Sequence, residues 1–204
     1  MSKITNIIPA QNYELVRNRI AEILIDEISM QLILSGNYEL DLTVDIENQS
    51  PNDKTELPLI NVSLINGNYG NKSYNGSITS TYQYTVDCYT NSKTINTTKG
   101  IQISTFKCHK LLGVCRYILE NPIYKTLGYN AGFIQRVFIS DLQIAASKNG
   151  NDDAFNTVMG RLTFNVVVTE TVDLLKPTIA SGYNTRIKIG NTNNGYQIIT
   201  NNYM

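Results

Sequence analysis

The single histidine of the sequence, His109, is the first residue to consider for catalysis. It stands between Cys108 and Lys110 in a stretch whose apolar residues have helical spacing. Adjacent residues of a helix point in different directions, so a cysteine nucleophile and a histidine base at these positions would not touch. A serine-based triad would also have to use this histidine. We therefore interpret His109 as a solvent-facing or core histidine.

Acidic pairs are the other residues whose spacing permits chemistry. Asp45 and Glu47 alternate along an expected strand, as a glycosidase carboxylate pair would. Asp152 and Asp153 lie in a polar stretch that could bind a cation. No other feature of the sequence supports either role, and we expect solvated acidic surfaces. A small enzyme built on these pairs is our third-ranked hypothesis.

The cysteine and glycine patterns that hold metals or phosphates are missing from the sequence. Cys88, Cys108 and Cys115 are odd in number and form no CxxC pair, which predicts buried free thiols in a reducing compartment. The stretch NGNYGNKSYNG at 66–76 lacks the GxxxxGK[ST] pattern and leads into an expected strand. We therefore predict no metal, no cofactor and no enzymatic activity.

Tyrosines near lysines suggest an alternative function. Tyr82, Tyr84 and Tyr89 fall near Lys72 and Lys93, and aromatic rings beside basic groups can stack nucleic-acid bases. A formal net charge of zero argues against a protein that binds nucleic acid mainly by charge. The alternative hypothesis is a single-stranded nucleic-acid-binding module that uses this tyrosine-rich strand.

Helices and strands must position these residues, and the spacing of apolar residues predicts them. In some stretches the apolar residues recur with helical period, and in others they alternate with polar residues as in a strand. The predicted helices are 11–35 and 98–121, and the predicted strands are 40–47, 57–65, 78–89, 137–145 and 158–171. Phe138, Leu142 and Ile144 are expected to share one face. The fold class is α+β: a mostly antiparallel sheet of about five strands with two amphipathic helices on one face.

Polar loops and a C-terminal arm complete the predicted organisation. Residues 66–77 form a polar loop rich in Asn and Gly, onto which the long strand 78–89 could pair back as a long hairpin. A single domain is expected over 1–175, with 176–204 as an extended arm or hairpin that contacts a neighbouring subunit. No stretch approaches the length of a membrane span. The other polar loop is 146–156, and the alternating runs of the arm are 185–189 and 196–200.

Charge is distributed unevenly along the chain. Residues 1–60 hold ten acidic and four basic side chains, whereas residues 61–204 hold seven acidic and thirteen basic ones. The first helix has an acidic outer face and the second a basic one. Opposite faces of this kind suit head-to-tail association of copies, which closes into a ring when the rotation allows it.

The order of elements resembles the bacteriophage tail terminator or tail completion family, the ring proteins of the phage neck. The likeness rests on an amphipathic helix at 11–35 that leads to a short strand, and on the strand entry LPLINV at 57–62. A variable loop and the strand YQYTVDCY at 82–89 follow, and then the helix at 98–121 with two long strands after it. The likeness covers about residues 11–175.

This resemblance implies a structural virion protein, assembled in the host cytoplasm, that forms a ring between the tail tube and the head connector. The ring is expected to be six-fold, with DNA only as passing cargo and no membrane partner. The two polar loops would contact the adjoining ring or tube, and the arm would add a strand to a neighbour's sheet edge. The expected interface residues are Asn68, Tyr69, Asn71, Tyr74, Lys107, Lys110, Glu22, Asp26, Arg186 and Lys188.

Overall fold

Two α-helices and five strands make up the part of the chain that the structure describes. The computed structural model describes residues 10–36, 42–47, 58–72, 77–93, 99–146 and 156–171. The elements are α1 (Asn12–Ser35), β1 (Thr43–Ile46), β2 (Leu59–Lys72), β3 (Ser77–Ser92), α2 (Gly100–Leu119), the short 3₁₀ helix η2 (Pro122–Tyr124), β4 (Ile134–Ala146) and β5 (Asn156–Thr171). The predicted α+β class is confirmed.

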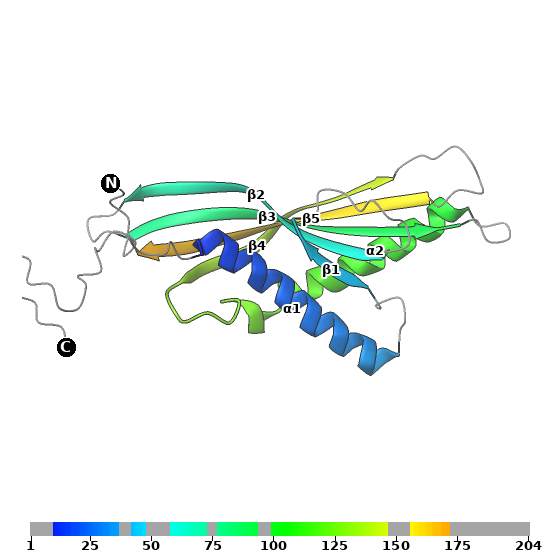
Figure 1. The fold of residues 1–204 in the computed structure, drawn as a ribbon, viewed down its shortest axis with the longest axis horizontal. Coiled ribbons are helices and arrows are strands. Elements are labelled where there is room, and N and C mark those ends of the chain that lie inside the picture. Colours follow the sequence, from blue (N-terminus) through cyan, green and yellow to red (C-terminus); the bar gives the residue numbers. More distant parts are fainter. Residues whose placement is uncertain are drawn as a thin grey trace, which may run out of the picture.

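All five strands belong to one sheet in the order β1-β2-β3-β5-β4. β1 runs parallel to β2, and the other three neighbouring pairs are antiparallel. Both helices lie on the same side of the sheet: α1 packs on β1 and β2, and α2 packs on β3 and β5 (Figure 1). The prediction of two helices on one face of a mostly antiparallel sheet is therefore correct.

Helix α1 forms because apolar residues repeat at helical period and because both of its ends are capped. At the N-terminus, the Glu14 carboxylate accepts a hydrogen bond of 2.7 Å from the Gln11 backbone N–H, within a capping box. At the C-terminus, Gly36 has a φ of 60° and donates its N–H to the Leu32 carbonyl at 2.9 Å. The buried stripe against the sheet is Val16, Ile20, Ala21, Ile23, Leu24 and Ile28.

Helix α2 approaches the sheet closely at Gly160 of β5. A Cβ at this position would lie 2.4 Å from Leu112 Cδ1 and 2.7 Å from Cys108 Sγ, so only a glycine permits the helix to sit at this depth. The helix ends before Pro122, because the residue before a proline avoids the helical conformation. The Asn121 side chain then caps η2 by accepting from the Ile123 N–H at 3.1 Å.

The core lies between the helix layer and one face of the sheet. The inward row of β3 includes Tyr82, Tyr84, Val86 and Cys88, none of which is more than 1% exposed. The Tyr84 hydroxyl donates to the Tyr13 carbonyl at 2.9 Å, so this buried polar group is satisfied. Burial raises the pKa of Tyr84 far above its ordinary value.

The opposite side, here called the open face, is polar and is not covered by any described element. Arg161 Nε and Nη2 donate to the two carboxylate oxygens of Asp87 at 2.7 and 2.8 Å. Asp87 is only 3% exposed, although neither α1 nor α2 lies over it. Gln83 Nε2 donates to Asn165 Oδ1 at 3.3 Å on the same face. The polar side chains of the open face thus satisfy one another.

The predicted loop at 66–77 is mostly strand. β2 continues to Lys72 and pairs with β3 as far as Ile78, with register shifts at Leu64/Asn66 and Tyr69/Lys72. The partner strand supplies hydrogen bonds along its full length, and this outweighs the weak strand preference of Asn and Gly. β2 and β3 therefore form the long hairpin that was predicted, and they run on past the N-terminal end of α1 (Figure 1).

The prediction that Phe138 shares a face with Leu142 and Ile144 is wrong. The pairing of β4 with β5 shifts register between Ile139 and Asp141, and an extra residue there reverses which side chains face the core. Phe138 lies opposite Asn165 on the open face, with the guanidinium carbon of Arg136 4.5 Å from its ring centroid.

Several predicted segments lie outside the described residues. They include most of the loop at 146–156, with Asp152 and Asp153, and the arm at 176–204. Within the described ranges, neither helix has the length and apolar character needed to cross a membrane.

Candidate assembly interface

Large apolar side chains project from the outer surface of the helix layer. On α1, Ile33 and Leu34 are 76% and 71% exposed. On α2, Phe106 and Tyr117 are 74% and 75% exposed, and Ile123 of η2 is 75% exposed. Soluble proteins tolerate single exposed apolar residues, but a set gathered on one layer is typical of a surface that a partner covers.

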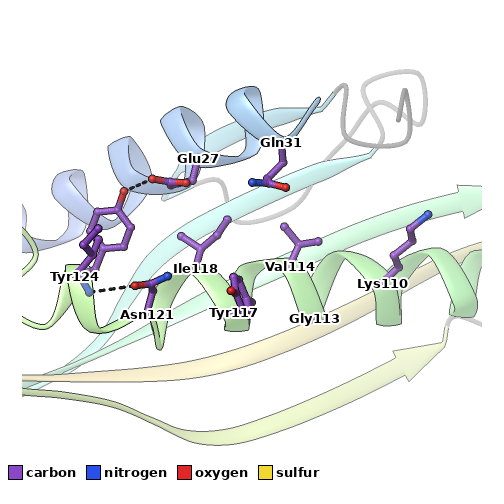
Figure 2. A pocket seen from close by; sticks show the side chains of 10 residues that line it. Glu27, Gln31, Lys110, Gly113, Val114, Tyr117, Ile118, Asn121 and Tyr124 are labelled. Atoms are coloured by element: carbon purple, nitrogen blue, oxygen red, sulfur yellow. Dashed lines mark hydrogen bonds between the residues drawn. The ribbon is translucent and has the colours of Figure 1, made fainter. Parts of the chain in front are cut away.

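A groove of ≈ 430 Å³ runs between α1 and α2 on this layer (Figure 2). Glu27 and Gln31 reach into it from α1, whereas most of its other residues belong to α2 and η2. It is lined by Glu27, Gln31, Lys110, Gly113, Val114, Tyr117, Ile118, Asn121, Ile123 and Tyr124. Its apolar members are Val114, Ile118, Ile123 and the two tyrosine rings, so the groove is suited to bury an apolar side chain with a few polar contacts.

One hydrogen bond joins the two walls of the groove. The Tyr124 hydroxyl donates to the Glu27 carboxylate, as the dashed line in Figure 2 shows. This hydrogen bond, followed by desolvation, raises the pKa of Tyr124 to about 12. The bond fixes η2 against α1, so the end of the groove at Tyr124 has a defined shape.

Gly113 leaves the α2 wall of the groove open. A Cβ built at this position meets no atom within 4 Å. Glycine in a helix interior is less stable than alanine by roughly 0.5–1 kcal/mol. No contact within the described chain requires this glycine, so the α2 backbone is open to the groove at this point.

The structure brings some of the predicted interface residues together. Lys110 lines the groove from α2, at the end away from Glu27, which is the neighbour of Asp26 in sequence. Asp26 and Glu22 are exposed on α1, and Glu22 accepts from Arg19 at 3.0 Å. The acidic helix and the basic helix therefore line one groove within a single chain, in addition to presenting outward faces.

Other predicted interface residues are placed apart from this groove. Lys107 is half-buried on α2 and is not among the residues that line the groove. Asn68 and Tyr69 are exposed on β2, far along the hairpin, and the Tyr69 ring packs edge-on against Tyr82 with centroids 5.9 Å apart. Asn71 lies in β2 as well. Tyr74, Arg186 and Lys188 lie outside the described residues.

The groove residues Gly113 and Tyr117, and the exposed pair Ile33 and Leu34, were not predicted. The signal that could have found them is the presence of apolar residues off the amphipathic stripe. Ile33 and Leu34 follow Leu32, the last residue of the predicted stripe of α1, and Tyr117 falls between the buried positions of α2. The amphipathic stripes account for the core residues of the two helices and leave these remaining apolar residues without a role.

Among the candidates for chemistry, Glu47 has a structural role in the described chain. Glu47 accepts from Arg17 Nη1 at 3.1 Å and from the Leu64 N–H at 3.0 Å, so this carboxylate holds β2 against α1. His109 is exposed on α2. Within the described ranges, no group of three or more His, Cys, Asp or Glu residues is arranged to hold a metal ion.

The three cysteines are buried free thiols, as the sequence predicted. Cys88 Sγ lies 3.8 Å from Cys115 Sγ, and Cys108 Sγ donates to the Cys88 carbonyl at 3.7 Å. The hydrogen bond with Cys115 and burial both raise the pKa of Cys88, and burial raises the pKa of Cys108 to about 11. Protonated, inaccessible thiols are poor nucleophiles.

The tyrosines invoked for base stacking are not available on the surface. Tyr82 is 1% exposed and Tyr84 is fully buried, and both rings belong to the core. Tyr89 is half-buried on the open face. A base therefore finds no row of tyrosine faces along β3.

No protein-family model matches this chain, and no curated protein sequence matches it either. The function proposed below therefore depends on the geometry of the chain itself.

Proposed function

We propose that this chain is a non-catalytic ring subunit of a phage virion, placed at the neck or proximal tail, where it joins the tail to the head connector. The observation that carries the proposal is the apolar helix layer with its open groove, which has the character of an interface that lacks its partner. The α+β fold with a long hairpin is the one expected from the family resemblance. The proposed partners are further copies of the chain, in a six-fold ring, and the tail tube and head-connector proteins.

A heterologous ring needs two different surfaces on each subunit. The helix layer supplies one surface, with Tyr117 and Ile123 in the wall of the groove. The β2–β3 hairpin supplies a second, because it extends beyond α1 and carries exposed Ile65 and Tyr69 at 52% and 56%. DNA passes through such a ring as cargo, and the subunit itself is assembled in the host cytoplasm.

The test is the mass of the particle in solution. Light scattering and native mass spectrometry of the full chain, alone and with candidate tail-tube and head-connector proteins, should give a multiple of 22.9 kDa. Gly113→Trp places an indole in the groove, and the matched control His109→Trp adds the same ring at an exposed α2 position that does not line the groove.

The groove variant should weaken assembly by about ten-fold or more, which corresponds to roughly 1.4 kcal/mol of lost association energy. The control should assemble as the wild type does. If the wild-type chain stays at 22.9 kDa with every candidate neighbour supplied, the proposed function is wrong. If both tryptophan variants assemble equally well, the groove is not the interface.

A further inference from the structure

We infer that the outer edge of β4 is a docking site for one strand, and that residues 185–189 of an adjacent copy occupy it. The inference rests on the proposed ring, because it needs a second copy of the chain at the sheet edge. It assigns a role to an edge that no described strand pairs with.

β4 is the terminal strand in the order β1-β2-β3-β5-β4. About half of the backbone N–H and C=O groups of an edge strand point away from its single partner and can bind another chain. In β4, residues 141–146 pair with β5 in unbroken register, from Asp141 opposite Thr163 to Ala146 opposite Val158. The bulges of β4 lie before this stretch, so it offers a regular edge of six residues.

The core-facing side chains of β4 are incompletely covered. Leu162 and Phe164 of β5 are fully buried, whereas Leu142, directly opposite Leu162, is 45% exposed. Ile139 and Ile144 are half-buried on the same side. The apolar layer of the sheet therefore continues one strand beyond the helices that cover it, and a further strand with apolar residues on that side would bury the remainder.

Residues 185–189 suit this edge because apolar and basic side chains alternate along them. Residues 185–189 read TRIKI, so Ile187 and Ile189 fall on one side of a strand and Arg186 and Lys188 on the other. Docked on β4, the isoleucines would extend the row of Leu142 and Ile144. The basic side chains would then lie on the open face, beside the Asp141 carboxylate. The C-terminal run 196–200 carries no charge and lacks this complementarity.

An adjacent copy fits this edge better than the same chain does. β5 ends at Thr171, and its Val168 pairs with Ile134, so the arm leaves the sheet at the end where β4 begins. The arm of the same chain would therefore run parallel to β4. To run antiparallel, the thirteen residues between 171 and 185 would have to span about 43 Å along the strands, nearly their full extension. An arm from a neighbour has no such restriction.

Disulfide crosslinking of the full-length chain tests the inference. One variant carries Gln143→Cys on β4, and others carry Arg186→Cys or Lys188→Cys on the arm. The three native thiols are buried, so they should not take part in the crosslinking. Under mild oxidation with a copper–phenanthroline complex, mixing a β4 variant with an arm variant should give a band at twice 22.9 kDa. The matched control replaces Gln143→Cys by Gln102→Cys, which is exposed on α2.

Crosslinking through the docked strand should exceed the control by about a hundred-fold, because docking holds the thiols at millimolar effective concentration. Rings that form normally but crosslink no better than the control would overturn the inference and leave the proposed function intact. A crosslink found only within single chains of the double variant Gln143→Cys/Lys188→Cys would overturn the assignment to a neighbour. If the chain never associates, both proposals are wrong. Light scattering of the same samples detects this outcome.

Discussion

Replacing Gly160 by alanine tests the seating of α2 on the sheet. The added methyl would lie 2.4 Å from Leu112 Cδ1, 2.9 Å from Leu112 Cγ and 2.7 Å from Cys108 Sγ. Carbon atoms in contact normally stay about 3.5–4.0 Å apart, so helix and sheet must separate by roughly 1 Å or Leu112 must leave its rotamer. Overpacking of this kind costs about 1–3 kcal/mol.

The effect of the alanine on the unfolded chain has the opposite sign and reduces this loss of stability. Alanine restricts the unfolded chain more than glycine does, which returns roughly 0.5–1 kcal/mol. The net loss for Gly160→Ala should be about 1–2 kcal/mol, which is a fall in Tm of roughly 2–8 °C for a chain of this length. The assay is urea and thermal unfolding followed by circular dichroism.

The matched control is Gly113→Ala. It makes the same substitution on the helix itself, at a position where a Cβ meets nothing within 4 Å. Its stability should rise by about 0.5–1 kcal/mol. The two alanine variants should therefore move in opposite directions. A Gly160→Ala protein as stable as the wild type would mean that α2 does not sit on β5 at this depth.

Three further outcomes follow from single contacts. Arg161→Ala should lower the free energy of unfolding by about 1–3 kcal/mol in urea titrations, because it leaves the buried Asp87 carboxylate without its bidentate partner. Ser80→Ala should be neutral or stabilising by up to about 1 kcal/mol, since the buried Ser80 hydroxyl has no hydrogen-bond partner among the described residues. The pKa of Cys108 is raised from 9.0 to about 11 in the folded state, so its stabilising contribution is complete below pH 9 and is lost as pH rises through 11. The unfolding free energy of the wild type should therefore fall across this range by about 2–3 kcal/mol more than that of Cys108→Ala. Equal slopes would show that this thiol is not buried as described.

Most of the fold could be predicted because its elements are long and strongly periodic. The helix predicted at 11–35 is Asn12–Ser35, and the strand predicted at 158–171 is Asn156–Thr171. Local apolar spacing reports which face of an element meets the core, and a long element repeats that signal many times. The loop predicted at 66–77 is mostly strand for a different reason. The pairing that makes residues 66–72 a strand comes from β3, another part of the chain.

The candidate interface was predicted only in part. Glu22, Asp26 and Lys110 were identified by charge, but charge along a helix does not reveal which residues face each other across two helices. That Lys110 and Glu27 line one groove depends on how α1 and α2 lie side by side. The exposure of Tyr117 and Ile123 follows from the same packing, because the groove leaves them without a neighbour.

The sequence by itself determined the two helices, the five strands, the inward rows of most strands and the buried free thiols, since each depends on the spacing of residues near one another in the chain. Only the tertiary structure decided that Phe138 turns outward at a bulge, that α2 descends onto Gly160, and that an apolar groove stays open between the helices. These features depend on contacts between residues distant in sequence, and such contacts are set by the register and packing depth of whole elements.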